Sequence, residues 1–353
     1  MMSTVDAWTL AASHAIRNVL AIHSRGVDRG DGNLLGAAYH ADATVDYGFF
    51  AGEASTLVSI LAGAQAAAPP TMHRTAGSDI RVSGAQAVAE SYVIAAIEEP
   101  GLRRTVFGRY LDRFRHDGDA WRIAHRIYVL DGNTNRPGDT SRADPPVASD
   151  HFVPAGGKGA SDAGRALLAH HDASTRMLQK VTPMAPDEAA LDAALAREAI
   201  RQLVAGYCRG VDRADAALLA SIFWEDATVI SGIVNGTAPD FARDITAFVR
   251  ANMQSCFHSV ANEWIKVRGD HAVGEHYVIA HARAAETDSM TGGRYIDRYE
   301  RRDGVWKIAS RAFVSDWATS HPTTYESGGF YEALTTRGCF GREDLVYGLW
   351  SQS

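Results

Sequence analysis

Apolar residues recur at helical spacing at the start of each half of the chain. Within residues 192–209, Ile200, Leu203 and Tyr207 fall on one face of a helix. Residues 5–24 follow the same pattern. An amphipathic helix is therefore predicted to open each half.

Alternating apolar and polar residues dominate the later part of each half. Before them, the sequence predicts a second short helix, as in "ADAALLASIFWED" at 214–226, a short β-like run, and a third helix near 54–67 or 239–254. Longer alternating segments such as "QAVAESYVIAAIEE" follow, and "DG" at 117–118 and 303–304 predicts a tight turn between the last two strands. Helices followed by an antiparallel meander indicate an α+β fold.

The two halves are copies of one another. "RGVDR" at 25–29 returns at 209–213, and "AVAESYVIA" at 87–95 returns as "AVGEHYVIA" at 272–280, at offsets of 184 and 185 residues. Each copy is much longer than the roughly 20–50-residue unit of a solenoid. We therefore predict a duplicated domain.

The chain divides into four predicted segments. Residues 1–137 form the first domain and residues 186–320 the second. Between them, residues 138–185 are rich in Pro, Gly, Ser and Asp, which is typical of a linker or surface tail. Residues 321–353 form a C-terminal tail.

Composition and charge exclude several classes of protein. The net charge is −7 with scattered Lys and Arg residues, so no nucleic-acid partner is expected. The sequence has no apolar run long enough to span a bilayer and no signal-peptide pattern at its start, so we expect a cytoplasmic protein without a membrane partner. Cys208, Cys256 and Cys339 lack ligand spacing, and no Gly-rich phosphate loop is present, so neither a metal nor a nucleotide cofactor is expected. The nearest approach to a metal cluster is the adjacent pair His170 and His171.

Several stretches together resemble a known superfamily. Each copy has an Asp near the end of its first helix, a His at the start of its first long strand, and "GRYxDR" before "DGxW". This arrangement resembles the SnoaL-like branch of the NTF2-like superfamily. In the second copy, "LASIFWEDA" at 219–227 and "YERRDGVWKIASR" at 299–311 are similar to hexachlorocyclohexane dehydrochlorinases and, more distantly, to scytalone dehydratases. The resemblance implies two fused cone or barrel domains, each with helices packed on a curved antiparallel sheet.

Each copy carries an Asp–His couple that suits proton abstraction. An ordinary histidine has a pKa of about 6.5, so near neutral pH it can take a proton from a weakly acidic C–H group. A carboxylate bonded to the second ring nitrogen orients the ring and stabilises the imidazolium. The candidate pairs are Asp28 with His73 and Asp212 with His258.

Further residues complete the candidate sites. Arg126 and Arg311, at matching places on the last strand, could stabilise a departing anion. The resemblance implies that both couples and these arginines correspond to the catalytic Asp, His and Arg of the dehydrochlorinases. The copies differ at Asp46 and Tyr47 of the first and His281 of the second, which are candidates for substrate binding. Packing, turn and helix-cap roles stay open as the alternative for each.

The resulting hypothesis is a cofactor-independent lyase. Its base removes a proton from carbon, and water, a halide or another anion leaves from the neighbouring carbon. The pocket of this fold is largely apolar, so a small hydrophobic substrate, aromatic or alicyclic, is implied. A carbon–carbon lyase, an isomerase or cyclase of the same superfamily, and a non-catalytic small-molecule-binding protein stay open. The resemblance also implies association of copies through the outer sheet faces.

Overall fold

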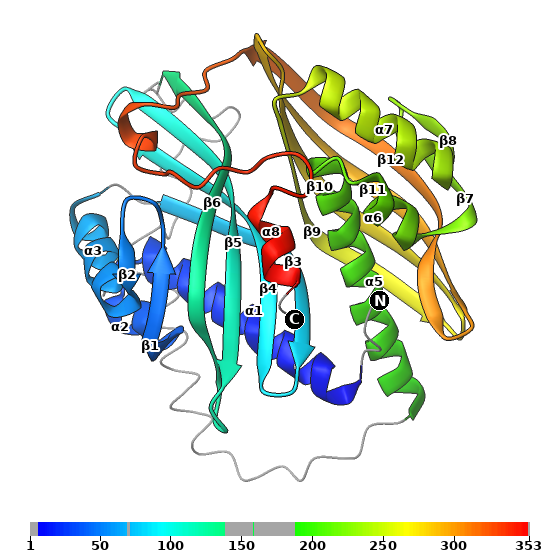
Figure 1. Ribbon diagram of the computed structural model, residues 1–353, viewed down its shortest axis with the longest axis horizontal. Helices are drawn as coiled ribbons and strands as arrows, with labels where there is room; N and C mark the ends of the chain where they lie inside the picture. The colour runs from blue at the N-terminus through cyan, green and yellow to red at the C-terminus, as the bar shows by residue number, and fades with distance from the viewer. Residues whose placement is uncertain (1–5, 69–70, 138–157, 159–187, 352–353) are drawn as a thin grey trace, which may run out of the picture.

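The computed structural model describes residues 6–68, 71–137, 158 and 188–351. Apart from Lys158, the predicted linker 138–185 lies outside the described residues, as do His170 and His171, and the domain boundaries stay predictions. Each half combines helices with a curved sheet, and the two halves lie side by side (Figure 1). No helix within the described ranges is long and apolar enough to cross a membrane.

The first domain has the predicted order of helices and strands. Its elements are α1 (Ala7–Asp28), α2 (Gly32–Ala37), β1 (Tyr39–Asp46), β2 (Ala51–Glu53), α3 (Ala54–Ala67), β3 (Thr71–Ser83), β4 (Gln86–Glu99), β5 (Leu102–His116) and β6 (Trp121–Pro137). The sheet order is β2-β1-β6-β5-β4-β3, and β1 runs parallel to β6 while the other neighbours are antiparallel.

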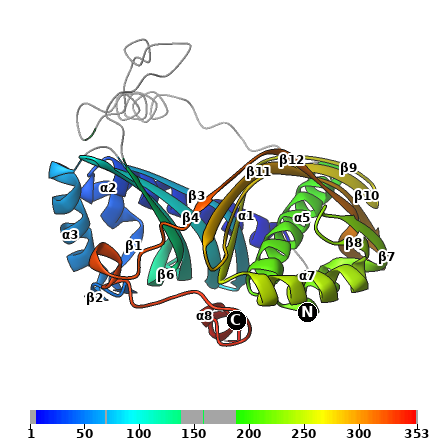
Figure 2. The same cartoon turned by 90° about the horizontal axis from the view of Figure 1, so that it is seen from above.

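The second domain repeats this order. Its elements are α5 (Glu188–Asp212), α6 (Ala216–Ile222), β7 (Phe223–Ile230), β8 (Asn235–Thr237), α7 (Ala238–Asn252), β9 (Ser255–Arg268), β10 (His271–Arg283), β11 (Thr287–Arg302) and β12 (Val305–Pro322). The sheet order is β8-β7-β12-β11-β10-β9. Neither sheet closes on itself within the described residues, so the predicted α+β class is confirmed in its open, cone-like form (Figure 2).

Local details follow from side-chain and backbone chemistry. Asp303 and Gly304 both have positive φ, 50° and 79°, as a two-residue type I′ hairpin requires, so the turn predicted at 303–304 is confirmed. At 117–118 the tight turn is replaced by a longer connection, residues 117–120, in which Gly118 has a positive φ of 92° and Asp117 does not. The helix predicted over 214–226 instead ends at Ile222. The next residue, Phe223, enters the sheet beside β12 and is fully buried, so strand pairing and burial override the helical pattern.

The C-terminal tail packs on the first domain. It leaves β12, crosses to the first domain through the short helix η3 (Gly329–Tyr331), and returns to α8 (Leu345–Trp350) (Figure 1). Tyr331 and Leu334 are buried against Ala95, Val106 and Leu130. Val346 and Leu349 are buried against Val88, Leu111 and Val129. The last part of the second copy therefore belongs physically to the first domain.

The two domains share part of their apolar core. The largest cluster of buried apolar side chains contains the second-domain core together with Tyr92, Ile94 and Phe107 of the first domain. Rings from the two domains meet directly, because Phe257 lies 5.2 Å from Tyr92 and 5.4 Å from Phe107 between ring centroids. The contact between the domains is therefore packed like an interior.

A cluster of buried charges joins the first domain to the tail. The fully buried Arg109 donates hydrogen bonds to Asp131 at 2.8 and 2.9 Å, to Glu90 at 2.9 Å and to Asp344 at 2.7 and 2.9 Å. Burial by itself would raise the pKa of Asp344, but Arg109 and Arg213 hold it well below its ordinary value. The tail is therefore attached by an ionised carboxylate.

The end of helix α5 and the residue after it bring two more arginines into this cluster. Arg209 donates to Glu90 at 2.6 Å, and Arg213 donates to Asp131 at 3.1 Å and to Asp344 at 3.0 Å. Because an unpaired buried charge is costly, each carboxylate fixes the position of an arginine from another part of the chain. The cluster consequently holds both domains and the tail in one arrangement.

Arg109 offers a direct test of this cluster. We expect Arg109→Met to lower the free energy of unfolding by about 3–5 kcal/mol, because it leaves buried carboxylates with fewer partners. Arg294 is the matched control: at the equivalent place on the second sheet it donates to Glu275 and Asp316 near the surface, so Arg294→Met should lower the free energy of unfolding much less. Urea unfolding measures both variants, and equal losses would contradict the argument.

Candidate active site

The Asp–His couple of the second domain joins a helix end to a strand. Asp212 is the last residue of α5, and His258 lies on β9. The backbone N–H of His258 donates to Asp212 Oδ2 at 2.8 Å, and Nδ1 of the ring lies 2.5 Å from Oδ1. Because an ionised carboxylate can only accept, Nδ1 carries the proton and Nε2 is left as a base. One carboxylate therefore fixes both the backbone and the tautomer of His258.

His258 lines a cavity of about 160 Å³ inside the second cone. Most of the lining side chains are apolar or aromatic, and they come from α5, α7, the four long strands and the connections that follow β7 and α7. They include Tyr207, Val211, Ile245, Phe248, Val249, Met253, Tyr295 and Phe313. A cavity of about 150 Å³ can accept a benzene-sized molecule, so the space suits a small ring.

The other titratable groups on the cavity wall stay neutral near neutral pH. Burial raises the pKa of Cys256 to about 12 and that of Tyr207 to about 12, and it raises the pKa of Tyr295 well above its ordinary value. Among the described lining residues, His258 is the one histidine, the side chain that most often serves as a general base. The described ranges contain no group of three or more His, Cys, Asp or Glu side chains that could hold a metal ion.

Arg311 lies behind the cavity wall. It donates to Asp297 at 2.8 and 2.6 Å and lies 4.0 and 4.2 Å from the ring centroids of two cavity tyrosines. Arg126 makes the same pair of bonds to Asp112 in the first domain, at 2.6 and 2.7 Å. In both arginines Nη1 has no hydrogen-bond partner among the described residues. Their proposed role in stabilising a departing anion stays a prediction.

The couple of the first domain has similar geometry but an additional donor. The backbone N–H of His73 donates to Asp28 Oδ2 at 2.9 Å, and Nδ1 lies 2.7 Å from Oδ1. The hydroxyl of Thr71 also donates to Oδ1, at 2.9 Å. In the second domain Cys256 occupies the position of Thr71, and a thiol is a weak donor. Oδ1 of Asp28 is therefore shared between the hydroxyl of Thr71 and the ring of His73. Sharing the oxygen weakens the stabilisation that Asp28 can give to a protonated His73.

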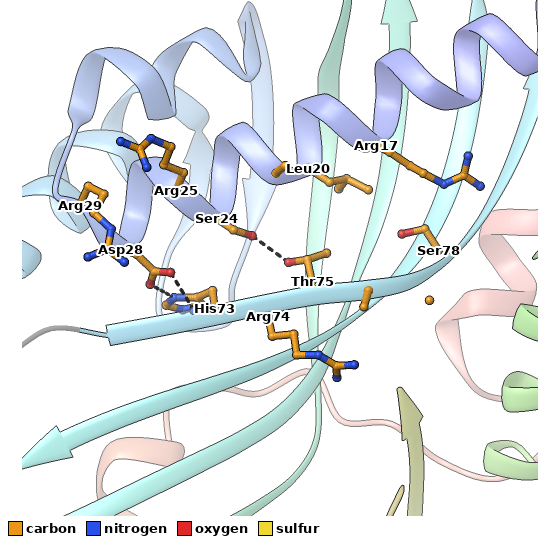
Figure 3. A pocket seen from close by; sticks show the side chains of 13 residues that line it. Arg17, Leu20, Ser24, Arg25, Asp28, Arg29, His73, Arg74, Thr75 and Ser78 are labelled. Carbon is orange, nitrogen blue, oxygen red and sulfur yellow. Dashed lines mark hydrogen bonds and ion pairs between the residues drawn. The ribbon is translucent and has the colours of Figure 1, made fainter. Parts of the chain in front are cut away.

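Aromatic side chains fill the interior of the first cone. Tyr47 stacks on Tyr128 with ring centroids 5.7 Å apart, and its hydroxyl lies 3.4 Å from His23 Nε2. Tyr110 packs against all three rings. The first couple instead lines a groove of about 470 Å³ between α1 and β3 (Figure 3). Tyr47 is thus part of a packed interior.

The other predicted substrate-binding residues also lie elsewhere. Asp46 accepts a hydrogen bond at 2.9 Å from the backbone N–H two residues further on, as a turn residue does. His281 lies on the outer face of β10, because its neighbours Ala280 and Ala282 line the cavity and successive strand residues alternate in direction. The ring of His281 stacks on Phe107 of the first domain at 4.2 Å. The structure therefore separates His281 from the pocket for which it was predicted.

Arg213 is a residue of the site that the sequence reasoning did not single out. It follows Asp212, and its Nη2 donates at 3.1 Å to the backbone carbonyl of Cys256, two residues before His258. Its Nη1 donates to Asp344 of the tail at 3.0 Å. Arg213 thus links the helix end that carries the carboxylate to the strand that carries the imidazole. The repeated "RGVDR", which places an Arg beside each candidate Asp, could have indicated it.

Comparison with known proteins gives matches in both halves. The family model described as "SnoaL-like domain" matches residues 8–127 and 192–312. Gamma-hexachlorocyclohexane dehydrochlorinase of Sphingobium indicum is 30% identical over 134 residues, which are 36% of this chain and 86% of that protein. Hexachlorocyclohexane dehydrochlorinase 1 of the same species is 31% identical over 124 residues, 34% of this chain and 80% of that protein.

Solved structures give a similar result. The crystal structure of the type 3 hexachlorocyclohexane dehydrochlorinase from Novosphingobium barchaimii LL02 is 29% identical, covers 36% of this chain and 90% of that chain, and has a TM-score of 0.34. A putative scytalone dehydratase from Novosphingobium aromaticivorans is 22% identical, covers 35% of this chain and 87% of that chain, and has a TM-score of 0.33.

The link through Arg213 can be tested without a substrate. Arg213→Lys keeps the charge but loses the planar fork that reaches both the carbonyl of Cys256 and the carboxylate of Asp344. We expect faster amide hydrogen exchange in the segment 255–260, because β9 then loses a contact that holds its start. Residues 71–75 of the first domain, which are equivalent to 256–260, serve as the internal control and should not change. Unchanged exchange in both segments would contradict the positioning role.

The buried His281 makes stability depend on pH. Burial lowers the pKa of His281 to about 4, below the ordinary value of about 6.5. The unfolded chain therefore binds a proton that the native protein rejects, so this contribution to stability is present above about pH 6.5 and is lost as the pH falls towards 4, by up to about 3 kcal/mol. His281→Phe, which keeps a ring beside Phe107, should lose less stability than the wild type over this range.

Urea unfolding at several pH values measures this difference. The variant His271→Phe is the control, since it removes an exposed imidazole at the start of the same strand. A His281→Phe variant whose stability falls with pH as steeply as that of the wild type would refute the assignment.

Proposed function

The chain belongs to the SnoaL-like domain family through both of its halves, and from this premise we propose that it is a cofactor-independent lyase whose working site is the second domain. Its relatives among the hexachlorocyclohexane dehydrochlorinases are themselves lyases. The observation that carries the proposal is an oriented imidazole on the wall of an apolar cavity. Nδ1 of His258 is bonded to the carboxylate of Asp212, and Nε2 has no hydrogen bond to another of the described residues.

The proposed reaction is an elimination. Nε2 of His258 takes a proton from a C–H group of the substrate, and the electron pair of that bond forms a carbon–carbon double bond. The leaving group departs from the neighbouring carbon with its bonding electrons, as chloride or, once protonated, as water. Asp212 stabilises the imidazolium of His258 until the ring returns the proton to solvent.

The cavity supports a substrate that is small and mainly apolar. Its volume of about 160 Å³ matches a single six-membered ring better than a larger molecule. Ser231, Ser289 and Thr291 carry the aliphatic hydroxyls of the lining, so they are the candidates for contacting a polar substituent or a departing anion. The surrounding apolar wall keeps water from competing for the base.

The second domain is favoured over the first for two reasons. Its cone keeps a cavity at the couple, whereas aromatic rings and the tail residues Tyr331 and Leu334 occupy the first cone. Its Asp212 also supports His258 without a hydroxyl like that of Thr71, which shares the carboxylate of the first couple. The first couple is therefore proposed to contribute little to turnover.

Chloride release from gamma-hexachlorocyclohexane is the direct test, because a relative of this chain is named as the dehydrochlorinase of that compound. We expect the wild type to release one chloride and one proton per double bond formed. His258→Gln should lower the rate by about 10²–10⁴-fold, as expected for loss of a general base. His73→Gln is the matched control in the other domain and should lower it far less. Prior dialysis against EDTA should not change the wild-type rate.

Several outcomes would count against the proposal. A wild type that releases no chloride would contradict dehydrochlorination of this substrate. Equal losses in the two His variants would contradict the assignment to the second domain. Deuterium entering the recovered substrate in D₂O without any leaving group would favour an isomerase that uses the same base.

A further inference from the structure

The floor of the second cavity is a row of side chains from three adjacent strands. His258 on β9 is paired with Ala280 on β10, which in turn is paired with Thr291 on β11. Directly paired residues share one face of a sheet, and all three line the cavity. Because neighbouring strands lie about 4.8 Å apart, Thr291 stands opposite His258 with one small side chain between them.

The same row exists in the first domain, but its last member is apolar. His73 is paired with Ala95, and Ala95 is paired with Val106, which is therefore the equivalent of Thr291. Apolar side chains of the C-terminal tail are buried against Ala95 and Val106. The chain itself thus occupies the place in the first cone that is a cavity in the second.

Of the three aliphatic hydroxyls in the lining, that of Thr291 is available to a ligand. Ser231 donates to the backbone carbonyl of Val234 at 2.7 Å, and Ser289 donates to Ser320 at 3.3 Å. Thr291 makes no hydrogen bond to another of the described residues. The valine at the equivalent position of the first domain also shows that the strand does not need this hydroxyl for its own structure.

The tyrosine rings of the lining pack against an arginine. Arg311 lies 4.2 Å from the ring centroid of Tyr295, as Arg126 lies 3.9 Å from that of Tyr110, the equivalent residue of the first domain. Tyr207 packs on the same Arg311, at 4.0 Å. Because the contact recurs in the filled first cone, it does not depend on a ligand. The unpaired hydroxyl is therefore the feature that distinguishes the second cavity.

The lining favours an oxygen substituent that carries no charge. None of its described residues is Lys, Arg, Asp or Glu, so a charged substituent would lose its hydration without a fixed opposite charge in the wall. The hydroxyl of Thr291 both donates and accepts, so it pairs equally well with an alcohol, a phenol or a carbonyl group. The apolar remainder of the wall encloses the ring that carries this group.

We propose that the second cavity selects a small ring with a neutral oxygen substituent, and that Thr291 is the residue that binds this oxygen. The ring lies over Ala280, with the reacting C–H group toward His258 and the oxygen on the opposite edge toward Thr291. The inference rests on the proposed function in taking His258 as the base that faces the substrate. It adds the substrate class, which is that of cyclic alcohols, phenols and cyclic ketones.

Titration calorimetry with phenol and toluene tests this selection without any turnover, because the two probes differ only in a hydroxyl and a methyl group. The wild type should bind phenol more tightly than toluene. Thr291→Val should weaken phenol binding about 3–10-fold, as expected for the loss of one neutral hydrogen bond, and should not weaken toluene binding. Thr287→Val, at an exposed position of the same strand, is the matched control and should bind both probes as the wild type does. Circular dichroism checks that each variant is folded.

The outcomes separate this inference from the proposed reaction. A wild type that binds toluene as tightly as phenol, or that binds neither, would overturn the oxygen site. A Thr291→Val variant that keeps the preference for phenol would overturn the role of Thr291, and benzoate bound as tightly as phenol would overturn the selection of a neutral group. A preference for phenol that Thr291→Val removes, in a protein that catalyses no elimination, would support the inference and contradict the lyase alone.

Discussion

The need to pair buried charges governs how this chain is arranged. Arg109 has no access to solvent and therefore requires carboxylates, and it obtains them from its own sheet and from Asp344 near the C-terminus. Arg209 and Arg213 reach the same carboxylates from the second domain. A shift of either domain or of the tail would leave a charge unpaired in an apolar interior. This cost selects one arrangement of the domains over the many that apolar contact alone would allow.

The single arrangement fixed by these charges also explains why the two copies of the Asp–His site have different surroundings. The chain has two domains but a single junction, so one sheet face is covered and the other is exposed, and one tail is available to close one cone. Tyr331 and Leu334 close the first cone, while the second keeps the cavity beside His258. The strand of His258 is packed against the first domain through Phe257. Duplication therefore repeated the Asp–His geometry without repeating its surroundings.

The interior of each cone shows how small changes decide whether a cavity exists. In the first domain, Tyr47 meets Tyr128 and the two rings stack across the interior. At the equivalent positions of the second domain, Ser231 and Phe313 both line the cavity, because a serine is too short to fill the space. Packing at near-crystalline density leaves no room for a ligand where two large rings meet. The volume available for chemistry is therefore set by pairs of side chains far apart in sequence.

The sequence by itself determined what depends on local order. The 184- and 185-residue offsets established the duplication, the periodicity gave helices before strands, and "DG" at 303–304 fixed a turn whose dihedral angles allow few alternatives. The resemblance in the two halves also identified Asp212 and His258. In the fold, Nδ1 of His258 lies 2.5 Å from Oδ1 of Asp212. These features survive because each is encoded within a few residues or recurs in both copies.

Only the tertiary structure decided which face of each strand meets which neighbour. Alternation places His281 and Ala280 on opposite faces but does not say which face is the cavity, because the first domain buries the outer face as well. The destination of the tail and the role of Arg213 depend on contacts with Asp344 that span 235 and 131 residues. Such contacts depend on the total free energy of burying charges and apolar surface together. A local sequence pattern does not contain that information.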